Sequence, residues 1–230
     1  MSERCPHGEC DGSGFVVDEA TNTARPCRCR PQRLARARAR SLSAVIPRRY
    51  RDVAFERQPV VDMDPGVVRA VRRFVDDIGP NLDAGRGFWL MGDVGTGKTT
   101  LAMLVSKAAL EAGRSVAIYS LPRLLAELRK TFDEDSDRSF LELLDRLAAV
   151  DLLHVDDLGA ERTSPWVIEQ LYSIVNSRYE ERRSMLVTTN LEREPLIEQI
   201  GERTVSRLTE MCDELPLFGH DRRETFAPVD

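Results

Sequence analysis

From about residue 85 onward, short apolar runs alternate with longer stretches in which apolar residues recur every three or four positions. Short runs of this kind are typical of buried β-strands, and the longer pattern is typical of amphipathic helices. The expected strands are 87–91, 115–120, 151–155 and 184–189, and the expected helices are 98–112, 122–131, 140–149 and 165–182. Strands that alternate with helices predict an α/β fold in which helices flank a parallel sheet on both faces.

The chain before this region has a different organisation. Apolar residues at helical spacing from Val67 to Ile78 predict an amphipathic helix that ends at Gly79-Pro80. Residues 31–43 are expected to form a short exposed helix, followed by a linker as far as Pro65. We therefore expect three parts: a cysteine-rich zinc-binding head at 1–30, an Arg-rich helix and linker at 31–65, and the main α/β domain at 66–230.

The composition is that of a soluble globular protein, with 42% hydrophobic and 31% charged residues among 230. No run without charge is longer than eight residues, which argues against a membrane-spanning helix. The first ten residues lack the apolar core of a secretion signal. These features lead us to expect a cytoplasmic protein.

The net charge of -5 is distributed unevenly along the chain. Residues 1–57 carry 12 basic and 7 acidic residues, giving +5, whereas residues 58–230 carry 21 basic and 31 acidic residues, giving -10. Nine arginines and no acidic residue lie between Arg28 and Arg51, a density that would attract phosphate backbones or an acidic protein surface. A solvated basic helix is the alternative, because arginine outnumbers lysine 30 to 3 in the whole chain.

Four of the five cysteines lie close together near the N-terminus: Cys5, Cys10, Cys27 and Cys29. In a reducing compartment, two close pairs separated by a spacer favour a tetrahedral zinc site over disulfides. Residues 12–17 would start a hairpin that turns at 21–23 between the pairs. The spacing within each pair is unusual, so a reduced tail without metal and a redox role stay open, and His7 could replace one thiolate. Cys212 is expected to be a buried core residue.

Between the expected strand 87–91 and the expected helix 98–112 the chain matches the phosphate-loop pattern. The expected nucleotide-binding residues are Gly92, Asp93, Val94, Gly95, Thr96, Gly97, Lys98, Thr99 and Thr100. The glycines let backbone N–H groups converge on the β-phosphate of ATP, and the helix dipole adds to this attraction. Lys98 would reach the β- and γ-phosphates, and the Thr99 hydroxyl would bind Mg²⁺. A Gly-rich turn with a surface lysine is the alternative.

Two acidic residues, Asp156 and Asp157, follow the hydrophobic run 152–155, at the strand end where ligands bind in open parallel sheets. Asp156 is expected to complete the Mg²⁺ site and Asp157 to polarise the attacking water, because ATP hydrolysis needs positioning and electrostatics rather than a covalent intermediate. Asn190, at the end of the next strand, would contact the γ-phosphate or the water, unless it is a plain turn residue. His154 is expected to point away from the acids and to pack in the core.

The order of these motifs resembles the DnaC/DnaI-like helicase-loader branch of the AAA+ ATPases and the related IstB transposition helpers. The resemblance covers about residues 45–227 and rests on five segments: Ile46–Arg51 with Phe55, the phosphate loop, Leu153–Gly159, Thr188–Asn190 and Gly201–Leu208. The cysteine-rich head is also similar to the zinc-binding N-termini of such loaders. The resemblance implies a P-loop AAA+ core with a truncated or absent helical lid, since only 23 residues follow Arg207.

The resemblance also implies roles for residues outside the phosphate loop. Arg207 would be an arginine finger that enters the ATP site of a neighbouring subunit, with Arg203 as a second contact, unless the two are an ordinary helix-surface pair. Arg223 is similar in position to the second sensor arginine of the family. The positions that match single-stranded DNA contacts are Phe132, Ser164 and Trp166, whose aromatic members would stack on bases unless they belong to the core.

Asp157 stands where most AAA+ ATPases have glutamate, so slow hydrolysis is expected. The implied function is an ATP-dependent loader of the replicative DNA helicase, which oligomerises with ATP, engages the helicase and single-stranded DNA, and is released by hydrolysis. The alternatives are an IstB-like ATPase that assists DNA transposition, a P-loop small-molecule kinase and a non-hydrolysing nucleic-acid-binding switch. The basic head could contact either protein or DNA.

Overall fold

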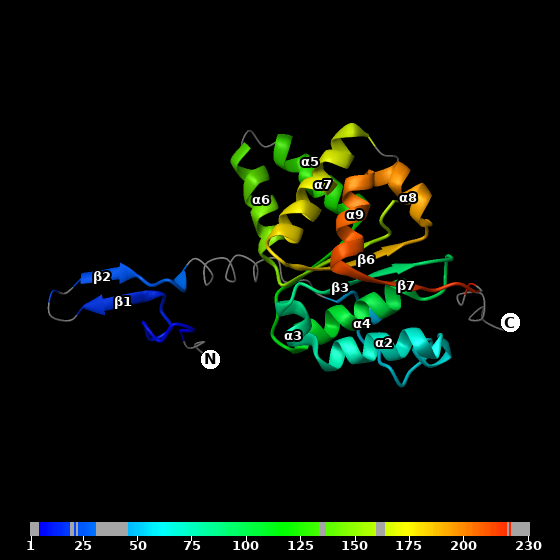
Figure 1. The fold of residues 1–230 in the computed structure, drawn as a ribbon, viewed down its shortest axis with the longest axis horizontal. Coiled ribbons are helices and arrows are strands. Elements are labelled where there is room, and N and C mark those ends of the chain that lie inside the picture. Colours follow the sequence, from blue (N-terminus) through cyan, green and yellow to red (C-terminus); the bar gives the residue numbers. More distant parts are fainter. Residues whose placement is uncertain are drawn as a thin grey trace.

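The computed structural model describes residues 5–18, 21, 23–30, 46–133, 137–159, 164–219 and 221. These residues form a two-stranded sheet near the N-terminus and a five-stranded sheet in the larger part of the chain (Figure 1). The helix expected at 31–43 lies outside the described residues.

The five-stranded sheet is parallel throughout, with the strand order β4-β5-β6-β3-β7. Its strands are β3 (Gly87–Met91), β4 (Val116–Ser120), β5 (Leu152–Asp156), β6 (Ser184–Thr189) and β7 (Cys212–Pro216). The four predicted strands are therefore confirmed, with ends that differ by one residue at most, whereas the sequence pattern did not predict β7. Because β5, β6 and β3 are adjacent, the loops that follow them meet at one edge of the sheet.

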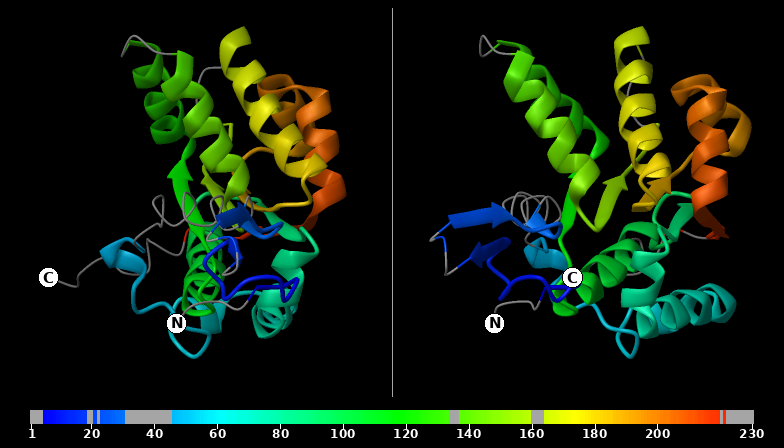
Figure 2. Two further views of the ribbon diagram at one scale, coloured as in Figure 1. Left: turned by 90° about the vertical axis from the view of Figure 1, so that its left-hand side faces the viewer. Right: turned by 60° about the vertical axis from the view of Figure 1, so that its left-hand side comes forward.

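Helices cover both faces of this sheet (Figures 1 and 2). The helices on one face, drawn below the sheet in Figure 1, are α2 (Pro65–Asp76), α3 (Ile78–Asp83) and α4 (Lys98–Glu111). Those on the other face are α5 (Leu121–Asp133), α6 (Asp137–Ala149), α7 (Pro165–Glu180), α8 (Arg193–Ile200) and α9 (Glu202–Met211). None of the described helices is long and apolar enough to cross a lipid bilayer.

The central strand β3 shows why its sequence is apolar at every position. Phe88 and Leu90 are buried in a cluster with α2, α3 and α4, whereas Trp89 is buried in a second cluster with α5 to α9. Successive side chains of a strand point to opposite faces, so a sheet that is covered on both faces needs apolar residues throughout. The continuous apolar runs that identified the strands therefore reflect two hydrophobic cores.

The helix expected to end at Gly79-Pro80 in fact ends earlier. Helix α2 runs to Asp76, and Gly79 and Pro80 lie inside the next helix, α3. Pro80 lies in the first turn of α3, where the missing backbone N–H has no helical acceptor to lose. Proline here belongs to the start of a helix rather than to the end of the preceding one, so the predicted boundary was wrong.

A buried arginine joins α7 to three other parts of the fold. The Arg178 guanidinium is fully buried and donates hydrogen bonds to the carbonyl oxygens of Leu147 (2.6 Å), Val150 (3.0 Å) and Ser184 (2.5 Å). Desolvation, with a smaller contribution from Arg183, lowers the pKa of Arg178 to about 9. This side chain satisfies carbonyl groups at the end of α6, before β5 and at the start of β6.

The N-terminal sheet is a hairpin of β1 (Phe15–Asp18) and β2 (Thr23–Pro26), which pair antiparallel. The expected hairpin between the two cysteine pairs is therefore confirmed. Among the described residues of the hairpin only Phe15 and Val16 are partly buried apolar residues, so it depends on another source of stability.

Candidate functional site

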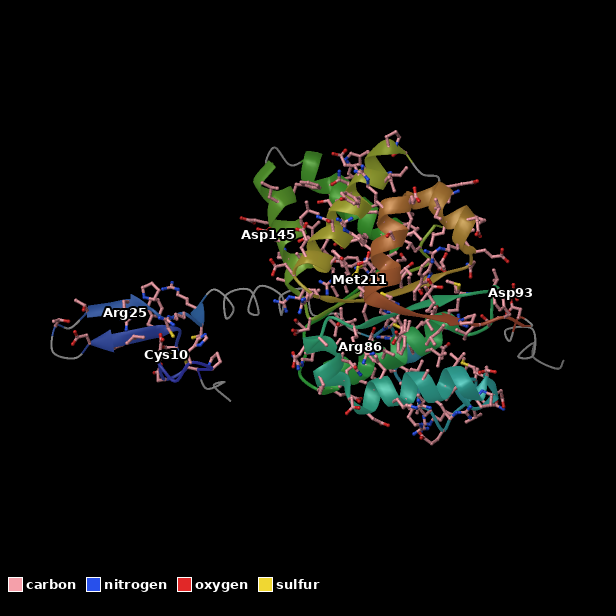
Figure 3. All side chains as sticks on the ribbon, viewed as in Figure 1. Cys10, Arg25, Arg86, Asp93, Asp145 and Met211 are labelled. Atoms are coloured by element: carbon pink, nitrogen blue, oxygen red, sulfur yellow. The ribbon has the colours of Figure 1, made fainter. Side chains whose placement is uncertain are left out.

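The phosphate loop connects β3 to α4 at the edge of the sheet where β3, β5 and β6 end. Figure 3 shows Asp93 of this loop beyond the carboxyl end of β3. Gly92 and Gly97 have φ angles of 133° and 101°. A Cβ atom on Gly92 would collide with the carbonyl oxygen of Leu217, and one on Gly97 would collide with the side chain of Met63. The loop conformation therefore requires glycine at these two positions.

Lys98 opens α4 and is almost fully buried, with 5% of its surface exposed. Its Nζ atom donates hydrogen bonds to the carbonyl oxygens of Gly92 (2.8 Å) and Asp93 (2.5 Å). The Thr96 hydroxyl donates to the same Asp93 oxygen at 2.9 Å. These bonds hold the ammonium group inside the loop, where a phosphate group would meet it.

The Asp156 carboxylate at the end of β5 accepts hydrogen bonds from two hydroxyl groups. Thr99 Oγ1 lies 3.0 Å and Thr188 Oγ1 lies 2.6 Å from Asp156 Oδ1. Burial raises the pKa of Asp156, but the interactions with His154, Thr188 and Thr99 outweigh it, so the pKa lies below its usual value. An ionised carboxylate beside a hydroxyl fits the oxygen ligands that Mg²⁺ prefers, so Asp156 and Thr99 could hold this ion.

Asp157 is held in place by Thr188, a residue of the segment Thr188–Asn190 for which no role of its own was predicted. Its backbone N–H donates to Thr188 Oγ1 at 2.9 Å, and its φ angle of 57° lies in the left-handed region. Thr188 is fully buried at the end of β6 and bridges Asp156 and Asp157 through its single hydroxyl. The sequence feature that could have identified this role is a hydroxyl residue at the end of a strand expected to lie beside the strand that carries Asp156 and Asp157.

His154 faces the same side of the sheet as Asp156, contrary to expectation. Its Nε2 atom lies 3.9 Å from Asp156 Oδ1, and its Nδ1 atom lies 3.0 Å from Ser106 Oγ. Residues two apart in a strand point to one face, which is why the predicted orientation was wrong. The expectation that His154 packs in the core is confirmed, because its side chain is fully buried.

A cavity of about 670 Å³ lies over the phosphate loop and combines residues from four parts of the chain. Nine of its lining residues were expected site residues: Val94, Gly95, Gly97, Lys98, Thr99, Thr100, Asp156, Asp157 and Asn190. The other seven come from the segment before α2: Arg49, Tyr50, Asp52, Val53, Arg57, Gln58 and Pro59. This second set, which we call the linker wall, was not predicted as part of the site. The segment Ile46–Arg51 with Phe55 carried part of the family resemblance, and this resemblance could have indicated that the segment contributes to the site.

Arg203 and Arg207 lie on α9 and do not line this cavity. They line a separate hollow of about 320 Å³ together with Tyr179 and Glu210. The Arg207 guanidinium lies 5.0 Å from the centre of the Tyr172 ring and 5.2 Å from that of Tyr179. Two aromatic faces within 6 Å of a guanidinium stabilise it electrostatically and restrict its position.

Of the three residues matched to DNA contacts, the structure describes the side chains of Ser164 and Trp166, which lie together at the start of α7. The Ser164 hydroxyl caps α7 by accepting from Val167 N at 3.3 Å, and Trp166 is half-buried in the first turn of the same helix. Arg129 of α5 lies 5.5 Å from the centre of the Trp166 ring. Phe132 belongs to α5, but its side chain lies outside the described part of the chain, as does Arg223.

The four N-terminal cysteines form a compact cluster in the head, which is labelled at Cys10 in Figure 3. Their sulfur atoms all lie within 4.8 Å of one another, with 3.7 Å between Cys5 and Cys27 and 3.6 Å between Cys10 and Cys29. Tetrahedral ligands at a Zn–S distance of about 2.3 Å would be roughly 3.8 Å apart. The cluster therefore fits a zinc ion, whereas His7 is exposed and outside the cluster.

The thiols of the cluster differ in their acidity. Burial and the neighbouring thiols raise the pKa of Cys29 to about 12. Burial also acts on Cys5, but backbone N–H groups of nearby residues outweigh it and lower the pKa of this thiol to about 6. Closely packed thiols cannot all ionise without a compensating positive charge, which a divalent metal ion would supply. The other cysteine, Cys212, is a buried core residue, as expected.

A family model described as IstB-like ATP binding protein matches residues 80–220, which is more than half of the chain. The chain belongs to this family. It is also similar to curated proteins named replicative helicase loader DnaC. The one from Buchnera aphidicola subsp. Schizaphis graminum is 28% identical over 160 residues, which cover 69% of this chain and 64% of the relative. The one from Escherichia coli K12 is 30% identical over 137 residues, 60% of this chain and 54% of the relative. The chain thus spans less than two thirds of either relative.

Solved structures show that the similarity to helicase loaders includes the fold. The crystal structure of the DnaC helicase loader matches 74% of this chain and 99% of that chain, with a TM-score of 0.65 and 28% identity. The DnaI structure matches 81% of this chain and all of that chain, with a TM-score of 0.59 and 25% identity. DnaA from Aquifex aeolicus, at 18% identity and a TM-score of 0.62, shows similarity of fold alone. This member of the IstB-like family therefore has a DnaC-like AAA+ P-loop fold. Its described residues after α9 contain one strand and no helix.

Proposed function

We propose that this IstB-like family member binds and hydrolyses ATP in the cavity between the phosphate loop and the linker wall. The observation that carries the proposal is the junction of Thr99, Asp156 and Thr188 beside the buried Lys98. The triphosphate would lie along residues 92–99, where backbone N–H groups and the α4 dipole favour negative charge. The base and ribose would lie against the linker wall, which lines the same cavity.

The residues around the γ-phosphate position would each have a different role in hydrolysis. Thr99 and Asp156 would hold Mg²⁺, which supplies positive charge to the phosphate oxygens when it is bound. Asp157 would orient the attacking water and accept its proton, and Asn190 would contact the water or the γ-phosphate. Both residues line the same cavity as Lys98. Lys98 would stabilise the charge that develops on the leaving phosphates.

Arg207 and Arg203 would complete the ATP site of a second copy. Their position on α9, outside the cavity of their own chain, supports a role in trans. An arginine supplied by a neighbouring subunit neutralises charge at the γ-phosphate and makes hydrolysis depend on assembly. Arg223 would be a further nucleotide contact in the same assembly.

The wider proposal is an ATP-dependent loader of the replicative DNA helicase. The similarity to proteins named replicative helicase loader supports this role. The zinc-bearing head and its Arg-rich extension would engage the helicase, and residues near Phe132, Ser164 and Trp166 would engage single-stranded DNA. Hydrolysis would then release the loader. The ATPase domain proper would comprise residues 66–230, together with the linker wall.

The test measures phosphate release from ATP alone, with the replicative helicase of the same organism, with single-stranded DNA, and with both. Turnover should depend on Mg²⁺ and change when the helicase and DNA are added, and Lys98→Ala should abolish it. Phosphate release without an acceptor would exclude a small-molecule kinase. Turnover that responds to neither helicase nor DNA would contradict the loader role while leaving ATP hydrolysis intact.

The second candidate function is an ATPase that assists DNA transposition. The match of residues 80–220 to the IstB-like family model favours it. Capture of purified helicase and of a purified transposase by the full chain, each with ATP and Mg²⁺, separates the two functions. Binding to the transposase and not to the helicase would reverse the order of preference.

A further inference from the structure

The linker wall has little secondary structure of its own. Between residues 46 and 59 the structure contains one short 3-10 turn, Arg48–Tyr50, and the rest of the segment forms turns, one bend and irregular backbone. This segment nevertheless supplies seven of the residues that line the nucleotide cavity. Something outside the segment must therefore fix its distance from the phosphate loop.

Lys107 of α4 makes such a contact. Its Nζ atom donates hydrogen bonds to the carbonyl oxygens of Arg51 (2.9 Å) and Val53 (3.2 Å), in the middle of the linker wall. Hydrogen bonds from a charged donor are roughly twice as strong as those from a neutral one. Lys107 itself does not line the cavity, so it holds the wall from outside.

The helix that carries Lys107 is the same helix that begins at the phosphate loop. Lys98 and Thr99 form its first turn, and most of its next seven residues are buried in the core below the sheet. A packed helix is rigid, so the distance between its first turn and Lys107 is fixed. Lys107 therefore connects the helix that carries the phosphate site to the linker wall, in addition to the packing of Val53 and Phe55 against the same core.

A second attachment holds the segment between Val53 and Arg57. Arg72 of α2 donates to Glu56 Oε1 at 2.9 Å and lies 4.2 Å from the centre of the Phe55 ring. Both charged groups are substantially exposed, with 45% and 71% of their side-chain surfaces accessible, so this pair is weak. It also lies beyond Val53, after the part of the wall that Lys107 contacts.

We propose that Lys107 is a positioning residue that fixes the linker wall against the base and ribose of the bound nucleotide. The inference rests on the proposed binding of ATP in this cavity. If Lys107 positions the wall, its loss should weaken the binding of ligands that possess a base and ribose. Binding of a ligand that consists of phosphate groups alone should not change, because the phosphate loop is untouched.

The experiment compares ADP, ATP and inorganic tripolyphosphate by titration calorimetry on the full chain with Mg²⁺. Lys107→Met removes the donors and keeps the length of the apolar stem, and Lys107→Arg keeps donors at this position. The matched control is Lys130→Met, at an exposed lysine of α5 far along the chain from the cavity segments.

For Lys107→Met we expect affinity for ADP and ATP to fall about fivefold to tenfold, less than a buried hydrogen bond from a charged donor would give, because the Lys107–Arg51 bond is exposed to solvent. Tripolyphosphate affinity should stay within about twofold, Lys107→Arg should recover most of the loss, and Lys130→Met should match the wild type. An equal loss for all three ligands, or no loss for ADP, would overturn the proposal for Lys107. A wild-type chain that binds neither ADP nor ATP would instead contradict the proposed function, and the role of Lys107 with it.

Discussion

Replacing Thr188 with valine removes one hydroxyl and preserves the shape of a fully buried side chain. That hydroxyl donates to Asp156 at 2.6 Å and accepts from the backbone N–H of Asp157 at 2.9 Å. A hydrogen bond to a charged group contributes about 1.5–3 kcal/mol, and a buried N–H left without a partner costs about 1–3 kcal/mol. Together these contributions amount to about 2.5–6 kcal/mol; because both hydrogen bonds are only partly buried, we expect the free energy of unfolding to fall by about 2–4 kcal/mol.

The effect on turnover follows from the backbone of Asp157. Its φ angle of 57° is a conformation that costs a non-glycine residue roughly 1–2 kcal/mol, and the hydrogen bond to Thr188 helps to hold it. Without that bond the Asp157 carboxylate loses its fixed position over the cavity. Because each 1.4 kcal/mol is a factor of ten in rate, ATP turnover at saturation should fall about 10- to 100-fold.

Three measurements test this reasoning on Thr188→Val and on Thr188→Ser, which keeps the hydroxyl. They are phosphate release at saturating ATP, ADP affinity by calorimetry, and unfolding by urea. ADP affinity should change less than about threefold, since the phosphate loop keeps its contacts, and the serine variant should retain most of the turnover. The reasoning is refuted if the valine variant turns over within about twofold of the wild type. It is also refuted if both variants lose turnover equally, because the methyl group would then be responsible.

The remaining predictions concern three other sites. Asp157→Asn should lower ATP turnover by about 10²-fold at unchanged ATP affinity, as expected when a general base is lost, and single-turnover phosphate release measures it. Cys27→Ser should lower the zinc content from one ion per chain to none and melt the hairpin, leaving ADP binding by the ATPase domain unchanged; metal analysis and circular dichroism check both. Arg178→Met should lower the free energy of unfolding by about 3–5 kcal/mol in urea, because it leaves several buried carbonyl groups unpaired.

Each of these variants has a matched control in the same chain. Asp213→Asn changes an exposed aspartate of β7 and should leave turnover unchanged. Cys212→Ala changes the core cysteine and should retain one zinc ion. Arg123→Met changes an exposed arginine of α5 and should alter the free energy of unfolding by less than about 0.5 kcal/mol. A control that matches its test variant in the stated measurement would contradict the corresponding prediction.

The central strands could be predicted because two-sided burial leaves a strong local pattern, as in Phe88, Trp89 and Leu90. Strand β7 could not, because it lies at the sheet edge and exposes Asp213 and Glu214, so no apolar run marks it. The boundary between α2 and α3 was misplaced because proline has opposite meanings at the end and in the first turn of a helix. Local sequence alone does not choose between these meanings at Pro80.

The phosphate loop and the acids after β5 could be predicted because their residues are contiguous and their spacing follows from the chemistry. Thr188 and the linker wall could not, because their roles arise from contacts between distant segments. Thr188 acquires its role when β6 pairs with β5, and Val53 when Lys107 binds its carbonyl oxygen. The cysteine cluster lies between these cases: its spacing suggested a metal site, and the hairpin brings the sulfur atoms together.

The linker wall also connects the cysteine-rich head directly to the nucleotide cavity. The segment that leaves the cysteine-rich head enters the described structure at Ile46 and forms the side of the nucleotide cavity immediately afterwards. A partner that pulls on the head therefore applies its force to the wall of the cavity before the force reaches α2 and the hydrophobic core. Conversely, a nucleotide that draws the wall toward the phosphate loop displaces the point at which this segment enters the ATPase domain.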